Sequence, residues 1–324
     1  MKLTRMLSVV LVLALLGALF TGCAVTEEDV TLRVGGMKGP TTMGMVNLIK
    51  ADADGTAEGD YEFTVATNAD ELTPKFIKGE LDIIAVPANL AANLYQKTEG
   101  EAQLLALNTL GVLYVVDKNT GITSVADLKG KTIYATGKGT TPEFTLRHIL
   151  QKNGIDPDKD VTLEFKSEPT EIVALLKGSD SGVAMLPQPF VTVAQTNVEG
   201  LKIALDLTEE WEKVDTDSSV VTGVLVVRKS FAAEHPKAVE TFLKEYAASV
   251  KQINDDPAAG SVLVEEYIAV KAPIAQKAIP ACNLVCITGK DMQPVIGGYL
   301  EALHAQNPAA VGGALPAADF YYAG

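Results

Sequence analysis

Two turns of nearly the same composition contain residues that could bind a small ligand. Residues 38–42 (KGPTT) and 138–142 (KGTTP) lie one hundred positions apart, and each follows a β-like run and precedes a helical pattern. Glycine lets another group approach the backbone closely, and threonine can cap the helix that follows. The first N–H groups of such a helix favour an anion or a polar group. The pair therefore predicts two helix ends that act on one small ligand between two similar lobes.

The lysine in each turn has two explanations. Lys38 and Lys138 could neutralise a sulfonate, a carboxylate or another anion that binds beside the turn. A lysine next to a turn glycine is, however, more often a solvated surface charge. The sequence leaves both explanations open.

The elements around the turns repeat with nearly the same offset. Residues 72–79 and 171–178 are each predicted to form a helix that ends at Lys-Gly, followed by a short buried strand and then Pro87 or Pro187. Hydrophobic periodicity also predicts strands at 31–34, 61–66, 104–107 and 161–165, and helices at 43–51, 89–97, 142–153, 236–255, 258–267 and 291–306. Strands that alternate with helices indicate an α/β fold with mainly parallel sheets.

Two further runs explain how the repeated units connect. Residues 111–116 (GVLYVV) and 223–227 (GVLVV) are apolar throughout, as expected for fully buried strands, and they bracket the second unit. We therefore predict two similar lobes joined by a two-strand hinge. The first lobe would be discontinuous, at 31–116 plus 223–324, and the second would be inserted at 117–222.

The N-terminus has the features of a bacterial lipoprotein signal. Lys2 and Arg5 precede an apolar stretch at 7–20, which is short for a membrane span but typical of a signal peptide. Residues 20–23 (FTGC) resemble a lipobox, although Phe20 stands where leucine is usual. We predict a signal peptide at 1–22, lipid on Cys23, a tether at 23–30 and an extracytoplasmic protein anchored to the cell membrane. Ordinary secretory cleavage is the alternative.

Size and charge limit the classes of partner. The 324 residues are enough for two domains with their own cores. The net charge of −14 argues against binding to nucleic acid and against electrostatic adhesion to anionic lipid. It does not determine the charge of the ligand, because a site can be locally positive in an acidic protein.

The remaining cysteines, Cys282 and Cys286, predict neither a metal site nor a firm disulfide. Four residues apart, they could approach bonding distance on a helix but not in a strand. Residues 283–287 are more typical of a strand, so two semi-buried thiols are the expected state and a disulfide is the alternative. The three histidines form no ligand-spaced cluster with them, and we expect no metal.

Several motifs appear in an order that is typical of one family. They are the lipobox at Cys23, the turn at 38–44, the runs 80–85 (ELDIIA) and 124–132 (SVADLKGKT), and 228–231 (RKSF) with His235 and Pro236 downstream. Through them the chain resembles the substrate-binding lipoproteins of ABC importers in the nitrate/sulfonate/taurine class. The resemblance covers nearly all of the chain after the signal and implies the type II periplasmic-binding-protein fold.

In such folds the ligand binds outside the carboxyl ends of the strands, which is where the repeated turns fall. The predicted contacts are hydrogen bonds from hydroxyl, amide and backbone N–H groups. For every threonine, ordinary helix capping is the alternative. The predicted ligand-binding residues are Lys38, Gly39, Thr41, Thr42, Asn89, Asn108, Gly139, Thr140, Thr141, Gln188 and Ser219.

Four other side chains have a possible place near the ligand. Trp211, the only tryptophan, could be a lid that stacks on a planar ligand or a packing residue. Met37, Met43 and Met45 could line an adaptable pocket, although filling a core is the commoner use of methionine.

The resemblance implies a monomer without a cofactor that captures a small solute and delivers it to a permease driven by a separate ATPase. The solute could be a sulfonate, another anion or a neutral pyrimidine. We expect no catalysis, because the phosphate-binding, nucleophile-elbow and zinc-protease motifs are missing. The alternatives are a ligand-sensing receptor component and a pyrimidine-synthesising enzyme of thiamine metabolism, which shares the fold but has a cysteine-rich signature that this chain lacks.

Overall fold

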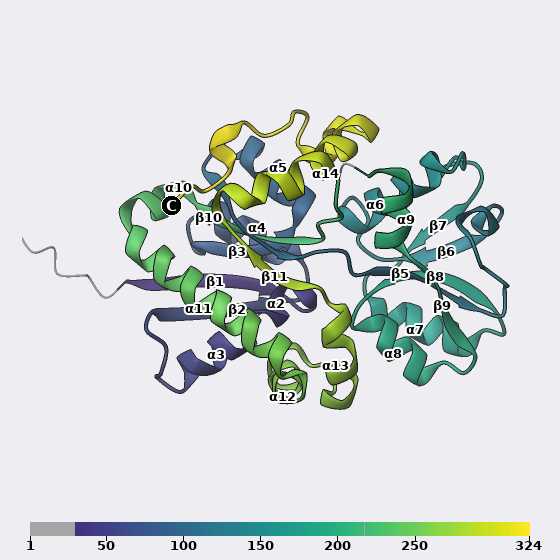
Figure 1. Cartoon of the computed structure of the whole chain (residues 1–324), viewed down its shortest axis with the longest axis horizontal. Helices are drawn as coiled ribbons and strands as arrows, with labels where there is room; N and C mark the ends of the chain where they lie inside the picture. The colour runs from purple at the N-terminus through teal and green to yellow at the C-terminus, as the bar shows by residue number, and fades with distance from the viewer. Residues whose placement is uncertain (1–29, 217) are drawn as a thin grey trace, which may run out of the picture. The chain divides into compact units, whose positions relative to one another are not determined.

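The computed structural model describes residues 30–216 and 218–324. By its internal contacts the chain divides into Met1–Thr31 and Leu32–Gly324, and the fold below is that of the second unit. The predicted signal peptide, Cys23 and nearly all of the predicted tether lie outside the described residues. The described chain forms two β-sheets with helices on their faces (Figure 1).

The first sheet has six strands in the order β11-β4-β10-β3-β1-β2. It gathers strands from the first hundred or so residues and from the last third of the chain. Their bounds are β1 Thr31–Met37, β2 Asp60–Ala66, β3 Ile83–Pro87, β4 Ala102–Thr109, β10 Gly223–Arg228 and β11 Leu284–Ile287. We call the part of the chain built on this sheet the first lobe.

The second sheet has five strands in the order β7-β6-β8-β5-β9. All of them come from one continuous segment. Their bounds are β5 Leu113–Lys118, β6 Thr132–Ala135, β7 Thr162–Phe165, β8 Gly182–Pro187 and β9 Leu201–Asp206. The part of the chain built on this sheet is the second lobe.

The two sheets share one strand order, which confirms the predicted similarity of the lobes. Without its edge strand β11, the first sheet runs β2-β1-β3-β10-β4, and the second runs β7-β6-β8-β5-β9. Each sheet thus has a crossing strand as its fourth strand, β10 between β3 and β4 or β5 between β8 and β9. The registers correspond as well, because Gly223 lies opposite Pro87 and Leu113 lies opposite Pro187.

The strand directions are mixed rather than mainly parallel. β1 pairs with β3, and β6 with β7 and β8, in parallel. Each crossing strand is antiparallel to both of its neighbours, β10 to β3 and β4, and β5 to β8 and β9. The physical reason is that a crossing strand enters its sheet from the other lobe, at the end where the neighbouring strands finish.

The first crossing lies earlier than the predicted lobe boundary at residue 116. β4 ends in the first sheet at Thr109, and β5 begins in the second sheet at Leu113. Residues 113–116, predicted for the first lobe, therefore belong to the second sheet, where Val115 and Val116 are fully buried. An apolar strand sequence shows burial but not which of two sheets buries it, so this boundary could not be read from the pattern.

Helices cover both faces of each sheet, and Figure 1 shows α7 and α8 on one side of the second sheet with α6 and α9 on the other. Most of the predicted helices are present with shifted ends. The predicted helix at 43–51 is two pieces, α2 and α3. The helices are α2 Pro40–Met43, α3 Val46–Ala53, α4 Ala69–Ile77, α5 Ala88–Lys97, α6 Thr141–Lys152, α7 Pro169–Gly178, α8 Phe190–Asn197, α9 Leu207–Val214, α10 Lys229–Glu234, α11 Pro236–Asp255, α12 Pro257–Ile268, α13 Ala272–Ala278 and α14 Met292–Gln306, with the short 3₁₀ turn η5 at Pro308–Val311.

One hydrophobic cluster extends from the first lobe into the second. It includes Val86 and Leu107 of the first sheet together with Val115 and Met185 of the second. The buried face of α14, which contributes Tyr299 among others, belongs to the same cluster and contacts α6. The C-terminal helix therefore packs on both lobes. The ends of the strands on which a ligand was expected lie beside this junction.

Candidate functional site

The first-lobe turn follows β1 and leads into the four-residue helix α2. Gly39 has φ 141°, a conformation that favours glycine. Thr42 is fixed inside the turn, because its Oγ1 donates to Met37 O at 2.5 Å. Thr41 is 5% exposed, yet its Oγ1 has no hydrogen-bond partner among the described residues. A buried hydroxyl without a partner is unusual in a native protein, and a ligand would supply one.

The end of β4 and the start of β10 lie directly beside Thr41. Asn108 Nδ2 donates to Thr41 O at 3.0 Å, and Thr109 Oγ1 donates to Asn108 Oδ1 at 2.9 Å. A Cβ on Gly223 would lie 2.5 Å from Thr41 Cγ2 and 2.6 Å from Asn108 Oδ1. Gly223 is thus required for the close packing of these two side chains, a role that sequence reasoning missed. Its position as the first residue of the crossing strand was the available signal.

A second unpartnered hydroxyl lies at the same end of the first sheet. Thr222 Oγ1 is buried and has no hydrogen-bond partner among the described residues. The backbone of Thr222 is bonded on both sides, since its N–H donates to Thr109 O and its carbonyl accepts from Ala88 N. Sequence reasoning did not select Thr222, because no pattern marks a threonine whose hydroxyl remains unsatisfied.

The first helix turns of α5 and α6, from different lobes, contact each other. Asn89 Oδ1 accepts from Thr141 N at 2.9 Å and from Thr141 Oγ1 at 3.2 Å. Asn89 Nδ2 donates to Gly139 O at 3.3 Å and to Ala310 O at 3.1 Å. Asn89 and Thr141 are 2% and 0% exposed. Three predicted site residues are therefore together, but they bond to one another across the lobes.

The side chain of Glu143, in the first turn of α6, bonds to the second-lobe turn. Sequence reasoning missed this residue. Its Oε2 accepts from Gly139 N at 2.7 Å, and its Oε1 accepts from Arg147 Nε at 2.7 Å. Arg147 also donates to Asp158 Oδ1 at 2.8 Å. The acid four residues before an arginine in 142–147 was a visible helix pair, but nothing showed that the carboxylate turns back to the Lys-Gly turn.

The other predicted site residues lie apart from these contacts. Thr140 Oγ1 donates to Gly137 O, and Gln188 Oε1, just before α8, accepts from Thr192 Oγ1 of that helix. Lys38 and Ser219 are exposed. Lys138 is exposed as well. We use the name strand-end site for the residues that the structure brings to the junction of the lobes, which are Thr41, Asn89, Asn108, Thr141, Thr222 and Gly223.

Comparison with known proteins bears on what such a site does. Residues 102–259 match the family described as NMT1/THI5 like. The match covers just under half of the chain, 158 of its 324 residues. The matched region begins at β4 and ends in α12, so it includes Asn108, Thr141 and Gly223 but not Thr41 or Asn89. Within the matched region lie the whole second sheet and both crossing strands.

One curated relative that matches part of the chain is named as a binding protein. A protein of Brucella abortus that is named as a binding protein is 28% identical over 150 residues, which are 46% of this chain. The match spans 44% of the relative's length, so the similarity reaches less than half of either protein.

Solved structures show the fold. An ABC transporter protein from Parabacteroides distasonis has a TM-score of 0.75 at 22% identity, covering 90% of this chain and 98% of that one. The periplasmic aliphatic sulphonate-binding protein of Escherichia coli has a TM-score of 0.69 at 14% identity, covering 86% and 88%. The predicted likeness to solute-binding proteins of the nitrate/sulfonate class is thus confirmed at the level of the fold.

Trp211 is a packing residue and not an exposed lid. It is 0% exposed, its Nε1 donates to Ser218 Oγ at 2.9 Å, and it lies against Tyr299 of α14. His148 of α6 stacks on it with ring centroids 4.2 Å apart. Burial lowers the pKa of His148, against the opposing charge of Asp215, whose Oδ2 is 3.4 Å from His148 Nε2. The rings of His148, Trp211 and Tyr299 thus pack α6, α9 and α14 against one another.

The sulfur-containing residues belong to the core. Met43 and Met45 are 0% and 1% exposed, as ordinary core filling predicts. Cys282 and Cys286 are both free thiols, and Cys286 lies in β11. The segment is therefore a strand, as predicted, and the alternative of a disulfide is wrong. Burial raises the pKa of Cys282 to about 12. In residues 30–216 and 218–324 no group of three or more histidine, cysteine or acidic side chains could hold a metal ion.

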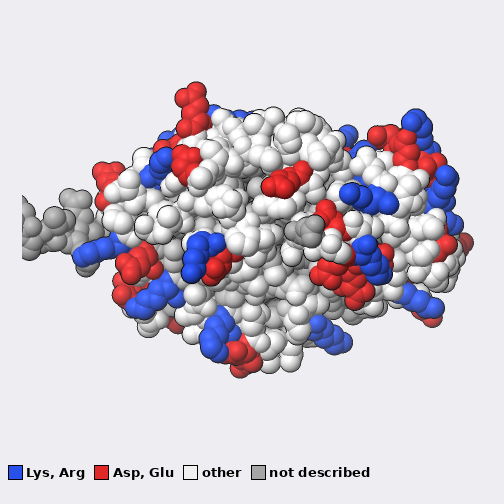
Figure 2. All heavy atoms as spheres, turned by 45° about the horizontal axis from the view of Figure 1, so that its top comes forward, with Lys and Arg blue, Asp and Glu red and all other residues white. Residues whose placement is uncertain are grey.

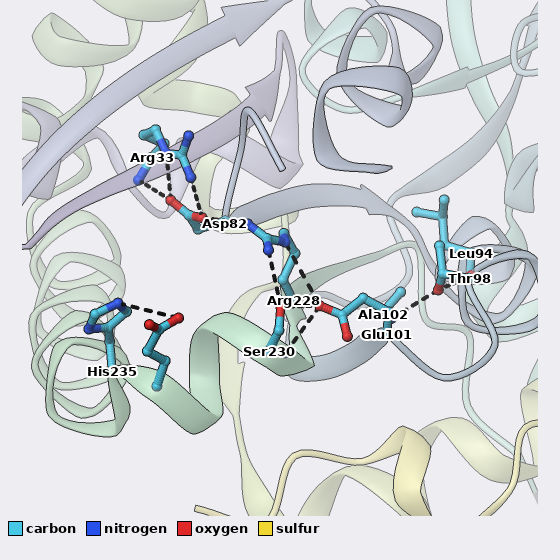
Figure 3. A network of polar contacts seen from close by, with 10 residues as sticks. Arg33, Asp82, Leu94, Thr98, Glu101, Ala102, Arg228, Ser230 and His235 are labelled. Atoms are coloured by element: carbon cyan, nitrogen blue, oxygen red, sulfur yellow. Dashed lines mark hydrogen bonds and ion pairs between the residues drawn. The ribbon is translucent and has the colours of Figure 1, made fainter. Parts of the chain in front are cut away.

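Two of the motifs that carried the family resemblance, 80–85 and 228–231, meet at the opposite end of the first sheet (Figure 3). Asp82, just before β3, accepts from Arg33 Nη2 at 2.7 Å and Nε at 2.8 Å, and from Arg228 Nη1 at 3.3 Å. The Asp82 side chain is 0% exposed. The hydrogen bond to Asp82 raises the pKa of Arg33. Glu101 accepts from Ser230 beside Arg228. Together with Arg33 and Glu101, these two motifs tie β1, β3, β4 and β10 together at the end of the sheet away from the strand-end site.

The surface carries charges of both signs. Figure 2 shows acidic and basic side chains next to each other around a broad uncharged area. Pairs such as Lys50 with Asp54 and Lys251 with Asp255 explain part of this mixture. In the described part of the chain no helix is both long and apolar enough to pass through a membrane.

Proposed function

We propose that this chain is the extracytoplasmic solute-binding component of an ABC importer. A small solute would bind at the strand-end site and would then be delivered to a permease served by a separate ATPase. The observation that carries the proposal is the pair of buried, unpartnered hydroxyls, Thr41 Oγ1 and Thr222 Oγ1, at the junction of two similarly ordered sheets. The fold of the solved ABC-transporter proteins supports it. We propose no catalytic step, because the relative is a binding protein and the site offers hydroxyls and amides.

Solute entry requires the lobes to part. The crossings at 110–112 and 218–222 would act as the hinge, and the contacts between Asn89 and Thr141 would open with it. A solute that contacts both lobes would shift the population toward the closed arrangement by its differential affinity. The permease would recognise that arrangement. In this proposal the two lobes are the two domains of the protein, and the second domain begins at β5.

Binding is tested with a small-solute screen on the full chain. A ligand that binds only the folded state raises the melting temperature saturably. The rise should be lost in Thr41→Ala and in Asn108→Ala. Thr73→Ala is the matched control, since Thr73 Oγ1 donates to Ala69 O within α4, away from the site. A rise that survives Thr41→Ala and Asn108→Ala would place the solute elsewhere.

The proposed anchor has its own test. Cys23 would carry the lipid, and Cys23→Ala should move the chain from the membrane fraction to the soluble extracytoplasmic fraction. Cys286→Ala is the control, because Cys286 lies in β11 of the folded unit. Equal membrane association of wild type and Cys23→Ala would exclude lipid on Cys23 as the anchor.

A further inference from the structure

The backbone N–H groups at the second-lobe turn are already bonded within the protein. Gly139 N donates to Glu143 Oε2, Thr140 N donates to Gly137 O, and Thr141 N donates to Asn89 Oδ1. On the facing helix, Ala88 N donates to Thr222 O. An anion at a helix N-terminus is held by free N–H groups of this kind. Here an anionic solute would have to displace a carboxylate and an amide that the protein itself provides.

The buried charge at this turn is negative, because the Glu143 carboxylate is bonded to the turn backbone while Lys138 of the turn is exposed. Glu143 and Asp158 share one guanidinium, that of Arg147, so the three side chains together carry one excess negative charge. The Glu143 side chain is only 10% exposed, which keeps its charge poorly screened.

The first-lobe part of the site offers neutral groups. Thr41 is 5% exposed, and its Oγ1 has no hydrogen-bond partner in the described part of the chain. This hydroxyl can donate one hydrogen bond to a ligand and accept others. The Asn108 amide and the Thr222 hydroxyl lie at the same strand ends. Lys38 and Lys138, the cations that could have met an anion, are both exposed.

We propose that the solute of this site is uncharged, and that Glu143 excludes anions from it. This deepens the proposed function and rests on it. An uncharged solute with hydrogen-bonding groups satisfies the Thr41 and Thr222 hydroxyls without approaching a carboxylate as a like charge. The fold is shared with a sulphonate-binding protein, but the carboxylate in the second-lobe turn separates this site from one built for an anion.

The test uses matched pairs of an anion and its uncharged isostere. Methanesulfonate with methanesulfonamide, benzoate with benzamide, and nicotinate with nicotinamide differ mainly in charge. Uracil, cytosine and myo-inositol extend the uncharged set, and nitrate extends the anionic set. The full chain is titrated with each compound in a thermal-shift assay, and compounds that shift it are followed by calorimetry. The uncharged member of a binding pair should bind about tenfold tighter or more, as a poorly screened like charge nearby requires.

Two variants separate the charge of Glu143 from its shape. Glu143→Gln keeps an acceptor for Gly139 N and removes the charge, so it should reduce the preference for the uncharged member by about tenfold. Glu171→Gln is the matched control. Glu171 is also the third residue of its helix, α7, and its Oε1 accepts from Glu168 N. It should leave the preference unchanged.

The outcomes separate the two proposals. An anion that stabilises the wild type saturably, loses this effect in Thr41→Ala and ignores Glu143→Gln overturns the uncharged-solute inference but keeps the binding function. A panel in which no compound of either class stabilises the chain contradicts the binding function itself. An uncharged compound that binds, with the preference reduced only by Glu143→Gln, supports both.

Discussion

The two ends of the first sheet use polar side chains in opposite ways. At the end where β3 begins, Asp82 is fully buried and accepts hydrogen bonds from Arg33 and Arg228. At the end where β3 finishes, Thr41 is buried with an unpartnered hydroxyl next to Asn108. Both ends lie on the same strands, so the backbone does not account for the difference.

The difference lies in which polar groups are satisfied. A buried charge is tolerated only when it is paired and hydrogen-bonded, which the Asp82 end achieves within the protein. An unsatisfied hydroxyl costs stability and is retained where a ligand supplies the missing partner. The Asp82 end should therefore matter for folding, and the Thr41 end for binding.

The largest expected effect follows from Asp82→Ala. The substitution removes the carboxylate with which both Arg33 and Arg228 form ion pairs. Removing one partner of a fully buried ion pair costs about 3–5 kcal/mol of unfolding free energy. Because the Arg33 and Arg228 side chains are 35% and 25% exposed, we expect a loss at the lower end of this range, about 3 kcal/mol. Urea denaturation at pH 7 measures the loss. Glu101→Gln is the control, because Glu101 is partly exposed and its loss should cost about 1 kcal/mol or less. Equal losses from the two variants would show that Asp82 does not organise this end.

Asn89→Ala should have the next largest effect, because the strand-end site also contains a satisfied part. The variant loses the bonds to Thr141, Gly139 and Ala310 and leaves Thr141 N buried without an acceptor. We expect a loss of about 2–3 kcal/mol in urea unfolding. Asn93→Ala, which loses the bonds to Asn89 O and Ala310 O, is the comparison at about 1 kcal/mol. An Asn89→Ala protein as stable as wild type would mean that this contact does not join the lobes.

Much of the fold could be predicted from the sequence, because burial and turn chemistry are local signals. The repeated proline after a buried run placed the ends of β3 and β8 correctly, and the apolar runs identified both crossing strands. Which sheet receives β5 depends on pairing partners that are distant in the chain. The same limit explains the antiparallel direction of the crossing strands, since alternation of strands and helices says nothing of a strand contributed by the other lobe.

The site was less predictable, because its chemistry depends on which neighbours satisfy which groups. Residues 38–42 and 138–142 have nearly the same composition, yet Thr41 keeps a free hydroxyl while Thr141 is bonded to Asn89. The Glu143 carboxylate accepts a hydrogen bond from Gly139 N and so places a negative charge at the second-lobe turn. Neither neighbour could be inferred from the turns themselves. The interaction of a ligand with these residues stays a prediction.

A third test concerns the support of the site by α6. Burial lowers the pKa of His148, and Asp215, Lys152 and Glu301 are the charged groups around it. A folded pKa below the unfolded value means that stability is complete above the unfolded pKa, about 6.5, and declines as the pH falls below it. The urea midpoint of the wild type should therefore fall between pH 7.5 and pH 5 more than that of His148→Gln. The difference should be smaller than the effect of Asn89→Ala. Parallel pH profiles would show that His148 titrates alike in both states.

The smallest change in stability should accompany a clear change in binding. Thr41→Ala removes a buried hydroxyl without a partner among the described residues, which stabilises the fold, but it also removes the buried Cγ2 methyl, which destabilises it. The two effects offset each other, so the unfolding free energy should change by less than about 0.5 kcal/mol in either direction. Thr141→Ala removes a hydroxyl that donates to Asn89 Oδ1 and should cost about 1 kcal/mol. For a bound uncharged solute, Thr41→Ala should weaken affinity by about tenfold, because the solute group that met the hydroxyl is left unpaired. Calorimetry and urea unfolding on the same two variants measure both quantities. If Thr41→Ala instead destabilises the chain as much as Thr141→Ala, the Thr41 hydroxyl has a partner within the protein, and the contrast between the two ends of the sheet disappears.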